Sequence, residues 1–218
     1  MSPKSFLLSE ELHDYLIGHS TPIDEVAQRL IERTAALGDV AGMQAAPEQG
    51  ILLTQLTRII GARNAIEVGT FTGYSALCIA RGLAEGGRLL CCDVSEEWTA
   101  LGREAWTDAG IADRIDLRIA PALDTLRSLP SDPVVDLAFI DADKPGYASY
   151  VEELVPRLRP NGVLLLDNTL WSGEVVNVSA EDANTLAIQA VNDAVAADER
   201  LTTVVLPISD GLTLSVKN

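Results

Sequence analysis

From residue 64 onward, short apolar segments alternate with stretches of helical spacing, and this alternation limits the folds that the chain can adopt. Helical stretches separate the first five apolar segments, and another precedes the sixth. Apolar strands joined by helical crossovers are typical of a parallel sheet that is covered on both faces. The predicted strands are 65–68, 88–92, 115–119, 134–140, 163–166, 203–206 and 212–216, and the predicted helices are about 73–84, 97–109, 121–129, 146–158 and 181–197.

The end of this pattern departs from a purely parallel arrangement. Only residues 207–211 separate the last two predicted strands. This connection is too short for a helical crossover, so the two strands should form an antiparallel hairpin. The sequence therefore predicts an α/β fold with a seven-stranded, mostly parallel sheet, an antiparallel last strand and helices on both faces.

Residues 9–61 precede the alternating pattern and divide into three segments with helical spacing. Pro47 opens the third segment and Gly61 closes it, as expected from the preference of proline for helix starts and glycine for helix ends. The length of 218 residues suits one α/β domain. We therefore expect a single domain, in which residues 1–62 form a helical cap or dimerisation region and residues 63–218 form the ligand-binding core.

The chain is strongly acidic, with a formal net charge of -16. Such a surface should repel nucleic-acid phosphates and anionic membranes, although acidity also serves solubility. The chain has three cysteines, Cys78, Cys91 and Cys92, and all lie in apolar segments. Their odd number and their positions indicate reduced residues of the core rather than disulfide bonds. The N-terminus lacks the apolar core of a signal peptide, and no apolar run is long enough for a membrane helix. We expect a cytoplasmic protein without nucleic-acid or membrane partners.

The first predicted strand runs into a turn that contains Gly69 and Gly73. Glu67 precedes the turn, and Asp93 ends the second predicted strand. Ligands of open α/β sheets bind at the carboxyl ends of the strands, where glycine permits close approach and a helix start offers free N–H groups. An acidic residue at the position of Asp93 suits the two hydroxyls of a ribose. The spacing is not Gly-x-Gly-x-x-Gly, so the pattern favours a nucleoside ligand over a nicotinamide dinucleotide, with a plain structural turn as the alternative.

Two later predicted strands stop abruptly at oxygen-bearing side chains. Asp141 follows the fourth strand, and Asp167 and Asn168 follow the fifth. Because consecutive strands of such a sheet often lie side by side, these three side chains should converge. Three oxygen ligands without thiolate or imidazole suit a hard cation, Mg²⁺ first, with Mn²⁺ or Ca²⁺ as alternatives. The other interpretation is that these residues only cap the helices that follow.

Lys144 lies three residues after Asp141, in the segment Asp-Ala-Asp-Lys. A partly buried lysine beside a cation can lose its proton and act as a general base. In most other contexts a single lysine is a solvated surface charge. The setting at a predicted metal site favours the catalytic interpretation.

Together these segments resemble the cation-dependent O-methyltransferase family, which includes caffeoyl-CoA O-methyltransferase and is related to catechol O-methyltransferase. The resemblance covers nearly the whole chain and implies the Rossmann-like fold of class I methyltransferases, with S-adenosyl-L-methionine as co-substrate. The segments that carry the resemblance are MQAAPEQG from Met43, IEVGTFTGYS from Ile66, APA from Ala120, FIDADK from Phe139, DNTLW from Asp167 and DG from Asp210.

The resemblance implies a role for each matching position. Lys144 matches the residue proposed as the catalytic base and also contacts substrate. Trp171 matches a wall of the acceptor pocket, with ordinary packing as its alternative role, and Tyr147 is a looser candidate for the same wall. The positions that match metal ligands are Asp141, Asp167 and Asn168, and those that match contacts to S-adenosylmethionine are Met43, Ala45, Glu67, Gly69, Thr70, Ser75, Asp93, Ala122 and Asp141.

Several positions depart from the family pattern, and one segment among them bears on the acceptor. Ala120 stands where many members have glycine, and Ala45 replaces a hydroxyl residue of the plant enzymes. The segment that follows Trp171, residues 172–177, is short and acidic and offers no basic side chain for a coenzyme A tail. The lack of a basic side chain in this segment, together with the net charge, favours a small catechol-like acceptor over a coenzyme A ester.

The expected function is therefore divalent-metal-dependent transfer of a methyl group from S-adenosylmethionine to one hydroxyl of a vicinal dihydroxy aromatic molecule. Three alternatives stay open: a caffeoyl-CoA-type ester as acceptor, a metal-independent methyltransferase, and a non-catalytic protein that binds S-adenosylmethionine. The family resemblance also favours a homodimer.

Overall fold

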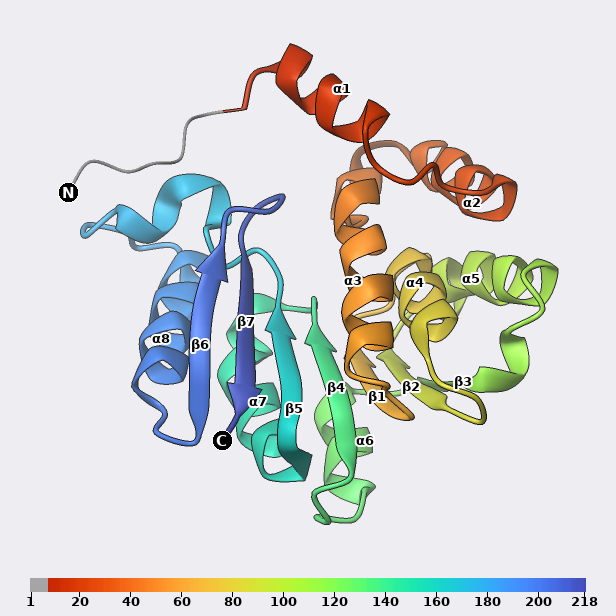
Figure 1. Ribbon diagram of the computed structural model, residues 1–218. Coiled ribbons are helices and arrows are strands. Elements are labelled where there is room, and N and C mark those ends of the chain that lie inside the picture. The colour runs from red at the N-terminus through yellow and green to blue at the C-terminus, as the bar shows by residue number, and fades with distance from the viewer. Residues whose placement is uncertain (1–7) are drawn as a thin grey trace.

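The computed structural model describes residues 8–218, and a seven-stranded sheet forms its centre (Figure 1). The strand order is β3-β2-β1-β4-β5-β7-β6. Strand β7 is antiparallel to both of its neighbours, and the other neighbouring pairs are parallel. The predicted α/β fold, with its antiparallel last strand, is confirmed. The strands are β1 (Asn64–Val68), β2 (Arg88–Asp93), β3 (Ile115–Ile119), β4 (Val135–Ile140), β5 (Leu158–Leu166), β6 (Leu201–Leu206) and β7 (Leu212–Lys217).

Helices cover both faces of this sheet, and each face has its own apolar core. One core joins the sheet to α3, α4 and α5, and the other joins it to α6, α7 and α8 (Figure 1). The α-helices are α1 (Glu10–Gly18), α2 (Glu25–Ala35), α3 (Pro47–Ile59), α4 (Tyr74–Gly82), α5 (Glu96–Asp108), α6 (Ala122–Ser128), α7 (Tyr147–Arg157) and α8 (Ala183–Ala197), and the 3-10 helices are η1 (Gly38–Met43), η2 (Ala112–Arg114), η3 (Lys144–Gly146) and η4 (Trp171–Val176).

Strand β2 shows how a continuous apolar strand contributes side chains to both cores. Leu89 and Cys91 belong to the core on the α3–α5 side, whereas Leu90 and Cys92 belong to the core on the α6–α8 side. Successive side chains of a strand point to opposite faces, so a strand with both faces covered must be apolar throughout. All three cysteines of the chain are buried and free, as the sequence predicted.

Local signals mark the starts of several helices. The carboxylates of Asp24 and Asp182 accept hydrogen bonds from the backbone N–H groups at the starts of α2 and α8, at 2.9 and 2.8 Å. Ser95 caps α5 in the same way at 3.1 Å. Pro47 occupies the first turn of α3, as predicted. Each cap satisfies an N–H that has no partner within the helix.

The N-terminal helices differ in how closely they join the core. Leu53 of α3 is fully buried in the core on the α3–α5 side of the sheet. Helix α2 contacts α5 through ion pairs that Arg29 and Arg33 form with Asp108 and Glu104. Helix α1 has no buried residue and projects from the body in Figure 1. In the described part of the chain, residues 8–218, no helix is both long and apolar enough to cross a membrane.

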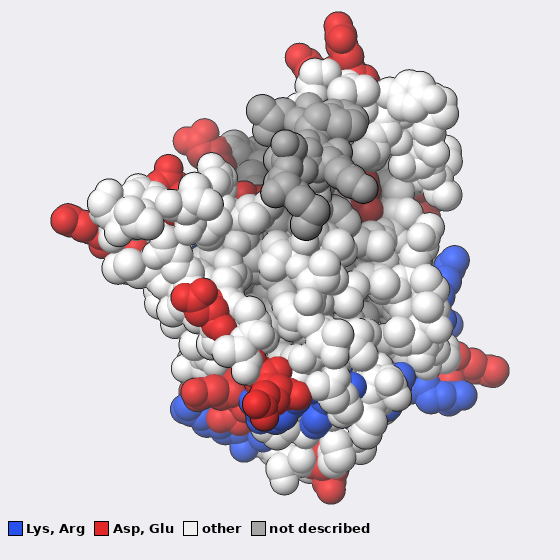
Figure 2. Space-filling view, turned by 60° about the vertical axis from the view of Figure 1, so that its left-hand side comes forward, with Lys and Arg blue, Asp and Glu red and all other residues white. Residues whose placement is uncertain are grey.

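Acidic side chains lie at both the upper and the lower end of the face shown in Figure 2. Lys and Arg side chains lie in the lower half of the face shown in Figure 2, which is the end where the parallel strands begin. The parallel strands end toward the upper half, and the candidate site described below lies there.

Candidate active site

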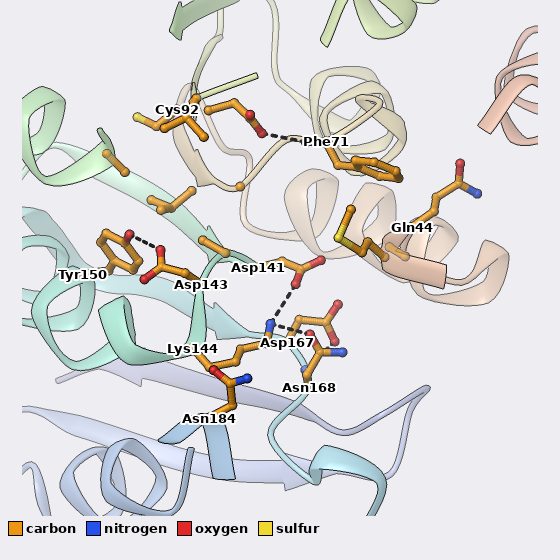
Figure 3. Close-up of a pocket in the computed structure, with 18 of the residues that line it drawn as sticks. Gln44, Phe71, Cys92, Asp141, Asp143, Lys144, Tyr150, Asp167, Asn168 and Asn184 are labelled. Carbon is orange, nitrogen blue, oxygen red and sulfur yellow. Dashed lines mark hydrogen bonds and ion pairs between the residues drawn. The ribbon is translucent and has the colours of Figure 1, made fainter. Parts of the chain in front are cut away.

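A cavity of about 1030 Å³ lies at the carboxyl ends of the parallel strands, where the sequence predicted ligand binding. A smaller recess shares Gly69 and Asp141 with it and is also lined by Thr70 and Ser75. The structure therefore brings most of the predicted site residues together (Figure 3). Those that line the main cavity are Met43, Ala45, Gly69, Asp93, Ala122, Asp141, Lys144, Asp167, Asn168 and Trp171.

The turn between β1 and α4 requires glycine at Gly69. Its φ is +88°, and a Cβ atom there would overlap the backbone oxygen of Asp141 at the end of β4. The ends of β1 and β4 therefore approach each other closely, and both border the cavity. Gly69 N–H also donates to the carbonyl of Cys92 at 2.9 Å, which ties the turn to β2.

Asp93 has a structural contact that the sequence did not reveal. One carboxylate oxygen accepts hydrogen bonds from the N–H groups of Thr70 and Phe71, both at 2.8 Å, and the other accepts from Ser95 at 2.7 Å. Asp93 therefore fixes the glycine turn as well as lining the cavity. Carboxylate oxygens can accept further bonds, so these contacts are compatible with binding of a ribose.

Glu67 lies beneath the turn and is fully buried. One of its carboxylate oxygens accepts from the Thr70 hydroxyl at 2.8 Å, while its Oε1 atom has no hydrogen-bond partner among the described residues. Burial raises the pKa of Glu67 from 4.5 to about 7, against the opposing effect of the nearby Ser75 and Thr70 hydroxyls. A buried carboxyl with an unused oxygen is suited to a cationic ligand group.

Aromatic side chains form a wall that the sequence analysis did not identify. Phe71 and Trp98 both line the cavity and pack edge to face, with ring centroids 5.2 Å apart. Trp98 lies in the first turn of α5, directly after the acidic end of β2. That position, next to the predicted ribose ligand Asp93, is the one sequence signal that could have identified it.

The three predicted metal ligands converge at the ends of two neighbouring strands. Asp141 follows β4, and Asp167 and Asn168 follow β5, which pairs with β4 in parallel. Asn168 has a φ of +56°, and its N–H donates to the Asp167 carboxylate at 2.7 Å. Asn168 tolerates this left-handed conformation better than most residues do.

Lys144 lies among these oxygens. Its Nζ donates to Asn168 Oδ1 at 2.6 Å and to Asp141 Oδ1 at 3.2 Å (Figure 3). The residue is only 9% exposed, and Nζ is 5.7 Å from the centroid of the Trp171 ring. Oxygens of Asp141 and Asn168 thus already bind a positive charge, as the ligands of a cation site do.

The electrostatics of the two carboxylates support this fit. Burial, together with the nearby charge of Asp141, raises the pKa of Asp167 to about 7. The pKa of Asp141 is also raised by burial, with Lys144 acting in the opposite direction. No group of three or more His, Cys, Asp or Glu side chains suited to a metal occurs in residues 8–218, so the candidate set consists of two carboxylates and one amide. These hard oxygen donors fit Mg²⁺.

Tyr147 lies elsewhere than the resemblance suggested. It is fully buried and does not line the cavity. Its hydroxyl accepts from Lys144 Nζ at 2.8 Å and donates to the backbone oxygen of Asp167 at 3.2 Å. It therefore supports Lys144 from behind. Tyr150, one helical turn further, is the tyrosine that lines the cavity, and it donates to Asp143 at 2.6 Å.

The fold, with its cavity at the carboxyl ends of the parallel strands, is that of the Rossmann-like class I methyltransferases, and comparisons with known proteins support this class. Residues 18–218 match a model of the O-methyltransferase family. The chain is 36% identical over 224 residues to caffeoyl-CoA O-methyltransferase 2 of Zea mays, covering 97% of this chain and 84% of the relative. It is 40% identical over 173 residues to catechol O-methyltransferase domain-containing protein 1 of Mus musculus, covering 78% and 66%.

A solved structure gives the same result. The O-methyltransferase from Bacillus cereus in complex with SAH superposes with a TM-score of 0.87 at 30% identity, covering 95% of this chain and 97% of that one. The chain belongs to the O-methyltransferase family, and it is an S-adenosylmethionine-dependent O-methyltransferase.

Proposed function

We propose that the protein is a divalent-metal-dependent O-methyltransferase that methylates one hydroxyl of a vicinal dihydroxy aromatic molecule. The observation that carries this proposal is the convergence of Asp141, Asp167 and Asn168 at one end of the cavity, where Lys144 bonds to Asp141 and Asn168. The donor types support Mg²⁺ as the ion, with Mn²⁺ or Ca²⁺ as alternatives.

In this proposal Asp141, Asp167 and Asn168 hold the cation. A bound divalent cation supplies positive charge that favours the deprotonated form of a hydroxyl beside it. Lys144 would act in its neutral form, after its ammonium has released one proton to solvent beside the bound cation, and its Nζ would then take the proton of the acceptor hydroxyl. Tyr147 keeps Lys144 in place from the buried side. The hydroxyl oxygen then bonds to the methyl carbon as the bond from that carbon to the sulfonium sulfur breaks. The products are the methyl ether and S-adenosylhomocysteine, and the protein contributes mainly by aligning the reactants.

At the other end of the cavity, the proposed contacts to S-adenosylmethionine divide by chemistry. The unused oxygen of Glu67 suits the ammonium group, and Asp93 suits the ribose. Met43, Ala45 and Ala122 supply apolar surface. The proposed contacts within or beside the glycine turn are Gly69, Thr70, Ser75 and Asp141.

The charge of the cavity supports a small acceptor over a coenzyme A ester. Arg and Lys side chains favour the binding of phosphate groups, but the cavity has few of these cationic side chains. In the described residues, Lys144 is the one cationic side chain that lines it, and the acidic ones are Asp93, Asp141, Asp143, Asp167 and Asp210.

The direct test is incubation of the purified protein with S-adenosylmethionine and a panel of acceptors, with Mg²⁺ or with a chelator, followed by mass spectrometry. The panel contains free catechols, dihydroxybenzoates, hydroxycinnamates, flavonoids and coenzyme A esters. We expect monomethylation of a free catechol that requires Mg²⁺. Equal product with chelator would indicate a metal-independent enzyme, and binding of S-adenosylmethionine without product would support a non-catalytic binder.

A further inference from the structure

Two turns lie against each other at the acceptor end of the cavity. The first, residues 168–173, follows β5 and is here called the acceptor turn. The second, residues 207–211, joins β6 to β7 and is called the hairpin turn. Two backbone hydrogen bonds join them, from Thr169 N–H to Gly211 O at 3.0 Å and from Leu170 N–H to Asp210 O at 2.9 Å.

A side-chain bond adds to this backbone pairing. The Asp210 carboxylate accepts a hydrogen bond from Ser172 N–H at 2.6 Å. A charged acceptor makes a stronger bond than a neutral one. Asp210 thus holds the part of the acceptor turn that directly follows Trp171.

The acceptor turn needs such support because its backbone is strained. Trp171 has a φ of +47° and Ser172 a φ of +50°. L-residues rarely adopt this region, and they persist there only when the surroundings hold them. In the structure, Asp210 is the side chain that bonds to this strained pair.

Gly211 makes the close approach of the two turns possible. Its φ is +89°, and a Cβ atom there would lie 2.5 Å from Leu170 N. The Asp-Gly pair of the hairpin turn and the Asp-Asn-Thr-Leu-Trp segment after β5 therefore act as one structural unit, although 42 positions separate Asn168 from Asp210.

We propose that Asp210 is a positioning residue that holds Trp171 in the wall of the acceptor pocket and thereby sets the affinity for the aromatic acceptor. Trp171 and Asp210 both line the cavity, and the Trp171 ring lies 5.7 Å from Lys144 Nζ. This inference rests on the proposed function in one respect, namely that the acceptor binds beside Trp171.

The two kinds of bond predict a selective effect. Thr169 and Leu170 bond to backbone carbonyls, which any residue at position 210 would supply. Only the bond to Ser172 needs the Asp210 side chain. Loss of the carboxylate should therefore release Trp171 while Asn168 stays in place.

The test compares Asp210→Ala and Asp210→Asn with the wild-type protein. In Asp210→Ala we expect the acceptor KM to rise about tenfold, the size that corresponds to one lost charge-assisted hydrogen bond. The affinities for S-adenosylmethionine and Mg²⁺ should change little. Asp210→Asn keeps an acceptor oxygen and should recover most of the loss. Asp198→Ala is the matched control, because Asp198 also accepts a backbone hydrogen bond, from Arg200 at 2.9 Å, and does not line the cavity.

A second readout does not depend on activity. Hydrogen–deuterium exchange across residues 170–176 should be faster in Asp210→Ala than in the wild type and close to wild type in Asp210→Asn. Unchanged exchange and unchanged KM in Asp210→Ala would overturn the proposal, as would equal losses of acceptor, cofactor and metal affinity. If the wild type methylates no acceptor, the proposed function fails, and the exchange result alone decides whether Asp210 holds the turn.

Discussion

Two buried carboxyl groups, Glu67 and Asp167, have few of the partners that a buried charge requires. Both have a pKa raised to about 7, mainly by burial. A carboxylate in such surroundings costs stability unless a cation or hydrogen-bond donors approach it. Asp167 lines the cavity where the proposed function requires a metal ion, and Glu67 lies beneath the glycine turn where it requires an ammonium group. The unfavourable charges of the free protein are thus located at the proposed ligand sites.

The pKa of Glu67 predicts how the stability of the protein without ligand depends on pH. The folded-state pKa of about 7 exceeds the ordinary value of 4.5, so the folded protein binds this proton more tightly than the unfolded chain. The stabilisation is complete below pH 4.5 and is lost as the pH rises to about 7. Glu67→Gln removes this dependence.

We therefore expect Glu67→Gln to become more stable relative to wild type across this pH range, by up to about 3 kcal/mol. Urea denaturation of both proteins at several pH values, without S-adenosylmethionine, measures the difference. A difference that is constant with pH would show that Glu67 does not titrate as described. The variant should also bind S-adenosylmethionine more weakly at pH 8.

The sequence predicted the candidate ligands because their signal is local. Asp141, Asp167 and Asn168 each follow an apolar strand directly, and the strand order then brings them together. The positions of Tyr147 and Asp210 could not be predicted in this way. Burial of Tyr147 and the bond of Asp210 to Ser172 depend on side-chain direction and on contacts between distant segments.

Among the elements, strands and helices were predicted well where periodicity was strong. Strand β5 is the main difference, since it starts at Leu158 instead of residue 163. Its first residues include Pro160 and Gly162, which locally indicate a turn, but Leu158 pairs with Val135 across a register shift. Helix α2 ends at Ala35 and a 3-10 helix begins at Gly38. In β5, pairing with the neighbouring strand β4 overrides the local preference for a turn.

The turn between β1 and α4 gives a prediction at the same scale. In Gly69→Ala the new Cβ would overlap the Asp141 backbone, so the ends of β1 and β4 must separate. We expect a loss of about 3 kcal/mol in stability and weaker binding of S-adenosylmethionine. Gly86→Ala is the control, because Gly86 also has a positive φ but has open space around it. It should lose only about 1 kcal/mol. Equal losses in both variants would contradict the close contact.

At the scale of the whole molecule, the exposed helix α1 bears on whether the chain forms a dimer. Helix α1 has no buried residue, and its Leu12 and Tyr15 are exposed. Such a helix gains stability by packing against another surface. We propose, in line with the family resemblance, that α1 packs against a second copy of the chain in a homodimer.

Light scattering after size-exclusion chromatography tests this proposal. We expect the wild type to have the mass of a dimer and Leu12→Glu to shift toward the monomer. Glu11→Gln is the control, since it changes a charge on the same helix without adding one to the apolar side. A monomeric wild type would contradict the dimer and would leave covering of the acceptor pocket as the function of the helix.

The central claim is that strand-end oxygens hold a divalent cation that methylation requires. The most direct measurement is the rate of catechol methylation as Mg²⁺ is titrated into chelator-treated wild type and Asp167→Asn, with S-adenosylmethionine saturating. The account predicts a rate that rises from near zero and saturates in the wild type, and at least a tenfold higher Mg²⁺ requirement in the variant, about the effect of one lost charged contact. Full activity without metal, or the same Mg²⁺ dependence in both proteins, would contradict it.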